Sequence, residues 1–181
     1  MARKQPTSSA LKSLRPHEFS AVLAALLKAH PDLVAEANEL AAGILDTATW
    51  ESVGDDVEHE LRSLPLEALN DRAGYDPGRG YIHECDAAGE VVQEALEPYL
   101  DDIARRLAMG MTAPAHQVAA GVLAGLHACD GEHGGDGLLG YAGDMDNYAH
   151  AVFMLLEKHQ APLPDDLLDA ACPSWSSLHF R

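Results

Sequence analysis

The chain has 181 residues, which is the length of one average globular domain, so it can bury an ordinary hydrophobic core without disulfide bonds. Its formal net charge of −17 at pH 7 disfavours binding to the phosphate backbone of nucleic acids. The longest apolar run, residues 21–27, is far shorter than the roughly 20 residues that cross a bilayer. Cys85, Cys129 and Cys172 are widely separated and odd in number, which favours free thiols and a cytoplasmic location.

The charge is unevenly distributed along the chain. Residues 1–15 contain four basic and no acidic residues, which leaves a net charge of −21 on residues 16–181. We expect a flexible basic tail over residues 1–15, a single helical domain over residues 16–172 and an irregular tail over residues 173–181.

Three apolar stripes with helical spacing occupy the first third of the chain. The first begins at Pro16, a residue suited to a first helical turn, and ends near Pro31. The second runs from residue 33 to residue 44, and the third runs from residue 50 to residue 64 and ends before Pro65. Because the connections between them are short, we expect neighbouring helices to be antiparallel.

A longer break follows at residues 70–81, where Asp-Pro-Gly and repeated glycines are typical of turns. The next stripe, from Val92 to Leu107, is the most regular in the chain. Pro98 lies inside it, so we expect a kink or a restart of the helix there.

A fifth helix is predicted from Thr112 to Leu126, and a sixth begins after Asp144. Gly121 and Gly125 would be costly in an exposed helix, so they predict the close approach of another backbone. A short last helix lies near residues 167–168, and no segment alternates long enough to predict a strand. The sequence therefore predicts an all-α fold, either an antiparallel helical bundle or a short stack of helical hairpins like an α-solenoid.

Residues 79–111, "RGYIHECDAAGEVVQEALEPYLDDIARRLAMGM", and the helix "PAHQVAAGVLAGLHAC" after them resemble helical regions of bacterial proteins of unknown function. Some of those proteins accompany SWIM-type zinc-binding proteins. The resemblance covers about a third of the chain and implies helical structure. The SWIM motif itself, Cys-x-Cys followed by Cys-x-His, does not occur in this sequence, so the resemblance implies no site residue.

A glycine-rich segment at residues 130–143 joins the fifth and sixth helices. Residues 135–140 match the pattern G-x-G-x-x-G, but a predicted helix precedes them where a nucleotide-binding fold requires a strand. The six glycines make ordering entropically costly, so we expect a mobile connector and not a ligand cradle.

Four side chains on the fifth and sixth helices have the residue types of a metal site. His116 and His127 are eleven residues apart and fall on nearly the same helical face, and Asp146 and His150 are four apart on the next helix. If these helices pack antiparallel, the four side chains could bind zinc or another divalent metal.

These observations support two functional interpretations. The first is a non-enzymatic, acidic helical module without a cofactor or catalytic residues, which binds another protein with a basic surface and binds neither nucleic acid nor a membrane. The alternative is a metal-dependent, hydrolase-like enzyme centred on the His/Asp site between the fifth and sixth helices.

Overall fold

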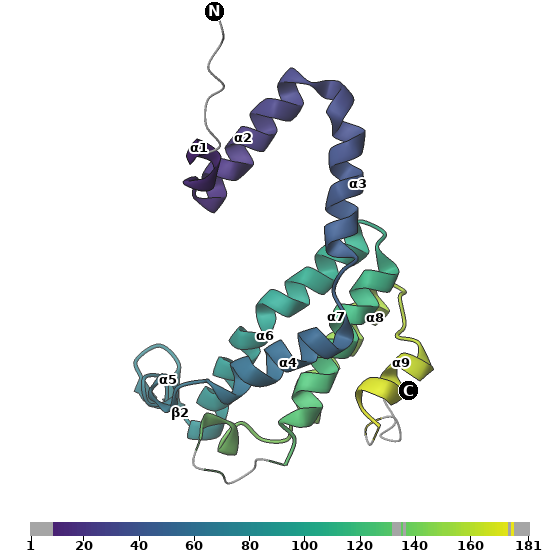
Figure 1. The fold of residues 1–181 in the computed structure, drawn as a ribbon. Helices are drawn as coiled ribbons and strands as arrows, with labels where there is room; N and C mark the ends of the chain where they lie inside the picture. Colours follow the sequence, from purple (N-terminus) through teal and green to yellow (C-terminus); the bar gives the residue numbers. More distant parts are fainter. Residues whose placement is uncertain (1–8, 132–134, 136, 174, 176–181) are drawn as a thin grey trace, which may run out of the picture. The chain divides into compact units, whose positions relative to one another are not determined.

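The computed structural model describes residues 9–131, 135, 137–173 and 175 (Figure 1). Over these residues the protein is all-α apart from one small two-stranded sheet, which confirms the predicted fold class. The chain divides into two compact units, residues 1–46 and residues 47–181. The boundary between them falls inside residues 16–172, for which the sequence predicted a single domain.

The first unit contains α1 (Ser9–Lys12), α2 (Pro16–Ala29), the 3-10 helix η1 (Pro31–Leu33) and α3 (Val34–Leu45). Helix α2 begins with Pro16 as predicted, and the backbone N–H of Arg15 donates a hydrogen bond of 2.7 Å to the Glu18 carboxylate. Helix α1 lies inside the predicted tail. None of the residues of α2, η1 and α3 is buried, so the first two apolar stripes form helices without enclosing a core.

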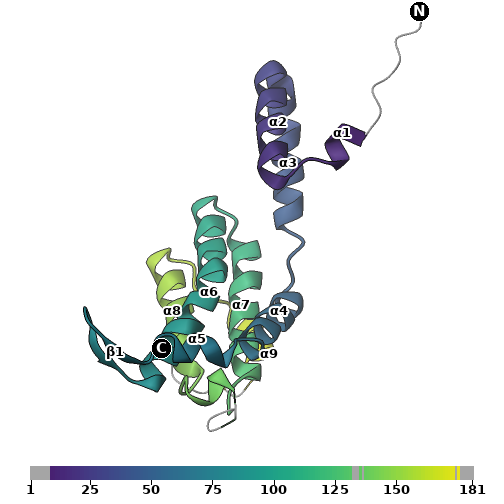
Figure 2. The ribbon, with the colours of Figure 1, turned by 90° about the vertical axis from the view of Figure 1, so that its left-hand side faces the viewer.

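The second unit holds the hydrophobic core. Its helices are α4 (Trp50–Arg62), α5 (Leu66–Asn70), α6 (Glu84–Ala108), α7 (Thr112–Ala128), η2 (Leu138–Gly140), α8 (Asp146–Lys158) and α9 (Asp165–Ala171). Helix α7 lies at its centre, because α4, α6, α8 and α9 all pack against it (Figure 2). Ten of the 17 residues of α7 are buried, which explains why this helix is apolar all round.

Helix α6 is the longest helix, with 25 residues. It continues through Pro98 without a restart, in contrast to one of the two outcomes predicted for that position. The acidic Glu84 and Asp86 stand in its first turn, where their charges complement the helix dipole. None of the helices in the described part of the chain is long and apolar enough to cross a membrane.

A β-hairpin occupies the break between α5 and α6, where the sequence predicted only turns. Strands β1 (Gly74–Asp76) and β2 (Gly80–Ile82) are antiparallel, with Tyr75 opposite Tyr81. The Asp76 carboxylate closes the turn by accepting hydrogen bonds from the backbone N–H groups of Gly78 at 2.8 Å and Arg79 at 2.7 Å. Strands of three residues are too short to show the alternating pattern on which strand prediction depends.

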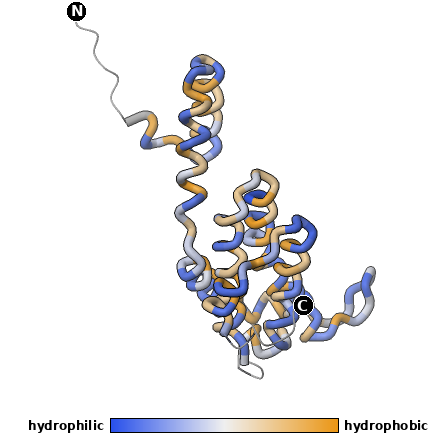
Figure 3. Tube along the Cα trace, turned by 90° about the vertical axis from the view of Figure 1, so that its right-hand side faces the viewer, coloured by the Kyte–Doolittle hydropathy of each residue, from blue (hydrophilic) through white to orange (hydrophobic). Residues whose placement is uncertain are grey.

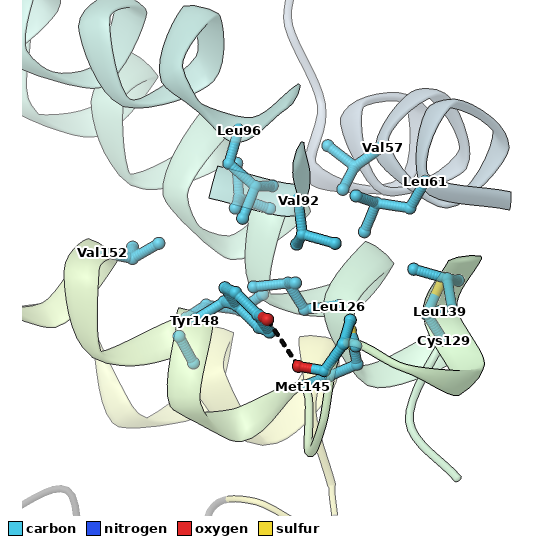
Figure 4. Close-up of a cluster of buried hydrophobic side chains, with 14 of the residues drawn as sticks. Val57, Leu61, Val92, Leu96, Leu126, Cys129, Leu139, Met145, Tyr148 and Val152 are labelled. Atoms are coloured by element: carbon cyan, nitrogen blue, oxygen red, sulfur yellow. Dashed lines mark hydrogen bonds between the residues drawn. The ribbon is translucent and has the colours of Figure 1, made fainter. Parts of the chain in front are cut away.

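Side chains from four helices meet in one core, shown in Figure 4. Helix α4 contributes Val57, and α6 contributes Val92. Helix α7 contributes Leu126, and α8 contributes Val152. This core contains residues of the apolar stripes predicted for the third to sixth helices, so in the structure those stripes face one another.

Helices α4 and α7 approach each other closely at their glycines. A Cβ atom added to Gly121 would lie 2.8 Å from the carbonyl oxygen of Trp50. A Cβ atom added to Gly125 would lie 2.9 Å from the carbonyl oxygen of Gly54. The structure thus confirms the predicted close approach of a second backbone at both glycines of α7.

We expect Gly121→Ala to lower the free energy of unfolding of the second unit by about 2–3 kcal/mol, because the added methyl group must push α4 away from α7. Urea denaturation followed by circular dichroism measures this change. Gly43→Ala in α3 is the control, since no atom lies within 4 Å of the position of its Cβ and alanine favours a helix. Unchanged stability of the Gly121 variant would show that the two helices can separate freely.

Candidate functional site

Helix α7 carries two of the four predicted metal ligands, and they lie at its opposite ends. The Nε2 atom of His116 is 3.2 Å from the carbonyl oxygen of Ala161, just beyond the end of α8. The ring of His127 packs edge-on against Trp175, with 5.3 Å between the ring centroids. Eleven residues of α-helix span about 16 Å, so the shared helical face does not bring the two imidazoles together.

The other two predicted ligands stand at the start of α8, where Asp146 is half-buried and His150 is exposed. The contact between His116 and Ala161 shows that α7 and α8 are antiparallel, as predicted. The same arrangement places the start of α8 far from His116. No three His, Cys, Asp or Glu side chains among the described residues form a group that could hold a metal ion, so the four predicted ligands do not form one cluster.

Three residues of the glycine-rich segment, Leu138, Leu139 and Ala142, pack into the core. Leu138 and Leu139 form the short helix η2 and are buried, which differs from the mobile connector predicted for residues 130–143. A Cβ atom on Gly140 would lie 2.9 Å from the backbone nitrogen of Gly135, so glycine is required there by close backbone packing. The first and last glycines of the G-x-G-x-x-G pattern thus have a structural role; residues 132–134 and 136 lie outside the described residues.

Trp175 packs into the core, although the sequence placed it in an irregular tail. Its side chain is buried, and its indole N–H donates a hydrogen bond of 3.2 Å to the Asp130 carboxylate. This contact joins the segment after α9 to the end of α7. The remainder of the predicted tail beyond Pro173, residues 174 and 176–181, lies outside the described residues.

Two of the three cysteines are buried thiols. Burial raises the pKa of Cys172 to about 12 and also raises the pKa of Cys129. Both thiols therefore stay protonated at neutral pH, and the protonated form is a poor nucleophile and a poor metal ligand. Cys85 is exposed at the start of α6. The structure agrees with the free thiols expected from the sequence, because it contains no disulfide among these three cysteines.

An open cavity of about 570 Å³ lies between the β-hairpin, the start of α6 and Tyr148. Two of its charged groups are paired with each other, because the Arg79 guanidinium donates hydrogen bonds to both carboxylate oxygens of Glu90, and a third, the Asp86 carboxylate, is exposed. The Tyr148 hydroxyl donates to the carbonyl oxygen of Ala142 at 2.5 Å, and burial raises its pKa (Figure 4). No buried side-chain nitrogen or oxygen in the described part of the chain lacks a hydrogen-bond partner, so no buried polar group is left for a ligand in this cavity.

The surface of the second unit is acidic because residues 47–181 hold 24 acidic and only seven basic residues, and its described arginines are paired with carboxylates of the same unit. The pairs are Arg62–Glu58, Arg72–Glu94, Arg79–Glu90, Arg105–Asp102 and Arg106–Asp102. Further exposed carboxylates lie on α4, α5, α6 and α9 and just after α5, at Glu51, Asp55, Asp56, Glu67, Asp71, Glu84, Asp86, Glu97, Asp101, Asp165, Asp166 and Asp169. This unit therefore presents a strongly negative surface.

The first unit presents the opposite kind of surface, which is apolar. Its helices carry exposed large side chains, namely Leu11, Phe19, Val22, Leu23, Leu26, Val34, Leu40 and Ile44. Figure 3 shows hydrophobic residues along both α2 and α3. Exposed apolar patches of this extent are typical of protein-binding surfaces.

No family model, curated protein or solved structure matches this chain. The resemblance of residues 79–129 to helical regions of bacterial proteins therefore stays a prediction.

We expect protein purified without a metal-affinity tag to contain no stoichiometric zinc, because the described residues bring together no group of three ligands. Elemental analysis, followed by titration of the metal-free protein with zinc and manganese, measures this. Near-stoichiometric metal that is lost in His116→Ala or His150→Ala would contradict the expectation and support the metal-dependent enzyme.

A second prediction concerns Asp102. Burial by itself raises the pKa of this carboxyl group, but hydrogen bonds from Arg105 and Arg106 outweigh it and lower the pKa below its ordinary value of 3.8. A lowered folded-state pKa stabilises the protein above the ordinary value, and the contribution is lost as the pH falls through the folded-state value. Because solvent screens these partly exposed pairs, Asp102→Asn should cost about 1 kcal/mol at pH 7 and progressively less below about pH 4.

Urea denaturation at pH 7 and pH 3 measures the effect of Asp102→Asn. Asp101→Asn makes the same change of charge at the neighbouring exposed position and is the control. A loss of stability that is equal at both pH values would show that the ion pairs of Asp102 do not carry the effect.

Proposed function

We propose that this chain is an acidic helical protein-interaction module that acts by binding another protein and not by catalysis. The observation that carries the proposal is the surface of α2 and α3. These helices bury none of their own residues and expose Phe19, Leu23 and Leu40. Isolated helices of 14 and 12 residues are only marginally stable in water, so such helices gain most of their stability from packing against another surface.

The charge of the second unit adds selectivity to this proposal. Its negative field attracts basic protein surfaces and repels the phosphate backbones of nucleic acids, and it would speed association with a basic partner at low salt. The ion pairs inside this unit support the same conclusion. Its described arginines are held by their own carboxylates and do not form a basic patch.

The proposal is tested by capture of partners with the immobilised full chain from an extract of the source cells. Three forms are compared: the wild type, Leu23→Asp and Met154→Asp. Leu23 in α2 is 50% exposed and Met154 in α8 is 51% exposed, so the two substitutions introduce the same charge at equally exposed helical positions.

We expect proteins captured by the wild type to be lost with Leu23→Asp and kept with Met154→Asp, because an aspartate in an apolar interface would be desolvated without a partner. The urea denaturation of the second unit should be the same in all three forms. Identical capture by the wild type and Leu23→Asp would contradict the proposed function.

A further inference from the structure

The two units differ completely in net charge. Residues 1–46 contain five basic and five acidic residues, so their net charge is zero. Residues 47–181 contain seven basic and 24 acidic residues, so they carry the whole net charge of −17. The apolar helices therefore belong to the neutral part of the chain, and a second copy of these helices can approach them without repulsion from net charge.

The apolar residues of the neutral unit repeat at the spacing of helices that pack side by side. In α2, Phe19, Val22 and Leu26 are three and four residues apart. In η1 and α3, the residues at 33, 37, 40 and 44 are separated by four, three and four. This alternation of three and four is the pattern of the apolar positions in helical bundles and coiled coils.

The charges within the unit are divided between its two halves. Residues 9–29 hold Lys12, Arg15, Lys28 and one acidic residue, so their net charge is +2. Residues 31–46 hold four acidic residues and no lysine or arginine, so their net charge is −4. Helix α2 itself holds Glu18 and Lys28 and is neutral, so the positive charge comes from Lys12 and Arg15 just before it. Residues 9–29 of one chain are thus complementary in charge to residues 31–46 of another chain, and a twofold axis would create that pairing twice.

The area of the apolar surface suits a dimer. Burying a large apolar side chain removes on the order of 100 Å² from water. The eight exposed large side chains of this unit can therefore contribute several hundred Å², compared with about 800 Å² per partner in a standard interface.

We propose that residues 9–46 bind the same residues of a second copy of this chain, with α2 of each copy packed against α3 of the other. The product is a homodimer joined by a neutral four-helix interface, with an acidic second unit on each chain. This inference rests on the proposed function, because it names the partner of the same apolar surface.

Sedimentation equilibrium of the purified full chain tests the proposal. We expect the wild type and Met154→Asp to have twice the chain mass of 19.3 kDa at micromolar concentration. We expect Leu23→Lys and Leu40→Asp to be monomers, since each places a charge in the apolar interface twice. Unchanged urea denaturation of the second unit shows that each variant is folded.

Mixing the two monomeric variants tests the pairing of α2 with α3. Leu23 and Leu40 lie near the middle of their helices, so in the proposed pairing the new lysine of one variant faces the new aspartate of the other. The mixed dimer has a second contact between α2 and α3, in which neither helix carries a substitution. We therefore expect an equimolar mixture of Leu23→Lys and Leu40→Asp to recover the dimer mass.

Two outcomes would overturn the proposal. The first is a wild-type chain that stays monomeric up to about 100 µM. A dimer with a Kd in the micromolar range would form well below that concentration, so no second copy would bind this surface. A wild-type dimer that persists in Leu23→Lys uses another surface. If the wild type is monomeric but partner capture is still lost with Leu23→Asp, the proposed function stands and only the second copy is wrong; if capture is also unaffected, both are wrong.

Discussion

The close approach of α4 and α7 is the constraint on which the second unit depends. A carbonyl oxygen of α4 lies where a side chain on α7 would begin, both at Gly121 and at Gly125. Because α7 also supports α6, α8 and α9, the positions of these three helices are set relative to a helix that α4 holds at short range. Glycine lowers helix stability in isolation, and the dispersion attraction between two closely packed helices offsets that cost.

Two buried aromatic side chains form hydrogen bonds to the long connection between α7 and α8. Tyr148 donates a hydrogen bond to the segment that precedes its own helix, and Trp175 donates one to the segment that follows α7. Both side chains are buried aromatic rings whose polar atoms are satisfied. The long connection between α7 and α8 is therefore held at both of its ends, and Leu138 and Leu139 bury its middle part against the core.

Much of this fold could be predicted from the sequence, because apolar spacing reports which face of a helix is buried. The stripes from Trp50 onward and the two glycines of α7 led to the correct helices and to the correct contact. The same spacing carries no information about what covers a stripe, so it did not predict that α2 and α3 belong to a compact unit of their own, residues 1–46. Spacing also shows which face of a helix two side chains share but does not bring them close along the helix axis. His116 and His127 therefore share a face and lie at opposite ends of α7.

Other features had no signal in the sequence. Trp175 follows a proline and a serine in a segment without periodicity, and its burial depends on a distant partner, Asp130. Leu138 and Leu139 are surrounded by glycines, whose entropic cost of ordering suggested mobility. Here a buried leucine pair stabilises the segment locally, and each leucine contributes about 1.5–3 kcal/mol on burial.

The separation of charge and apolar surface between the two units has a physical consequence for association. A protein with a net charge of −17 distributed evenly would repel its own copies at every approach and would weaken any apolar contact. With the net charge confined to residues 47–181, the interface proposed for residues 9–46 would join two segments without a like net charge. Salt shortens the range of this repulsion to about 8 Å at physiological ionic strength, so charges farther than this from the proposed interface would oppose it only weakly.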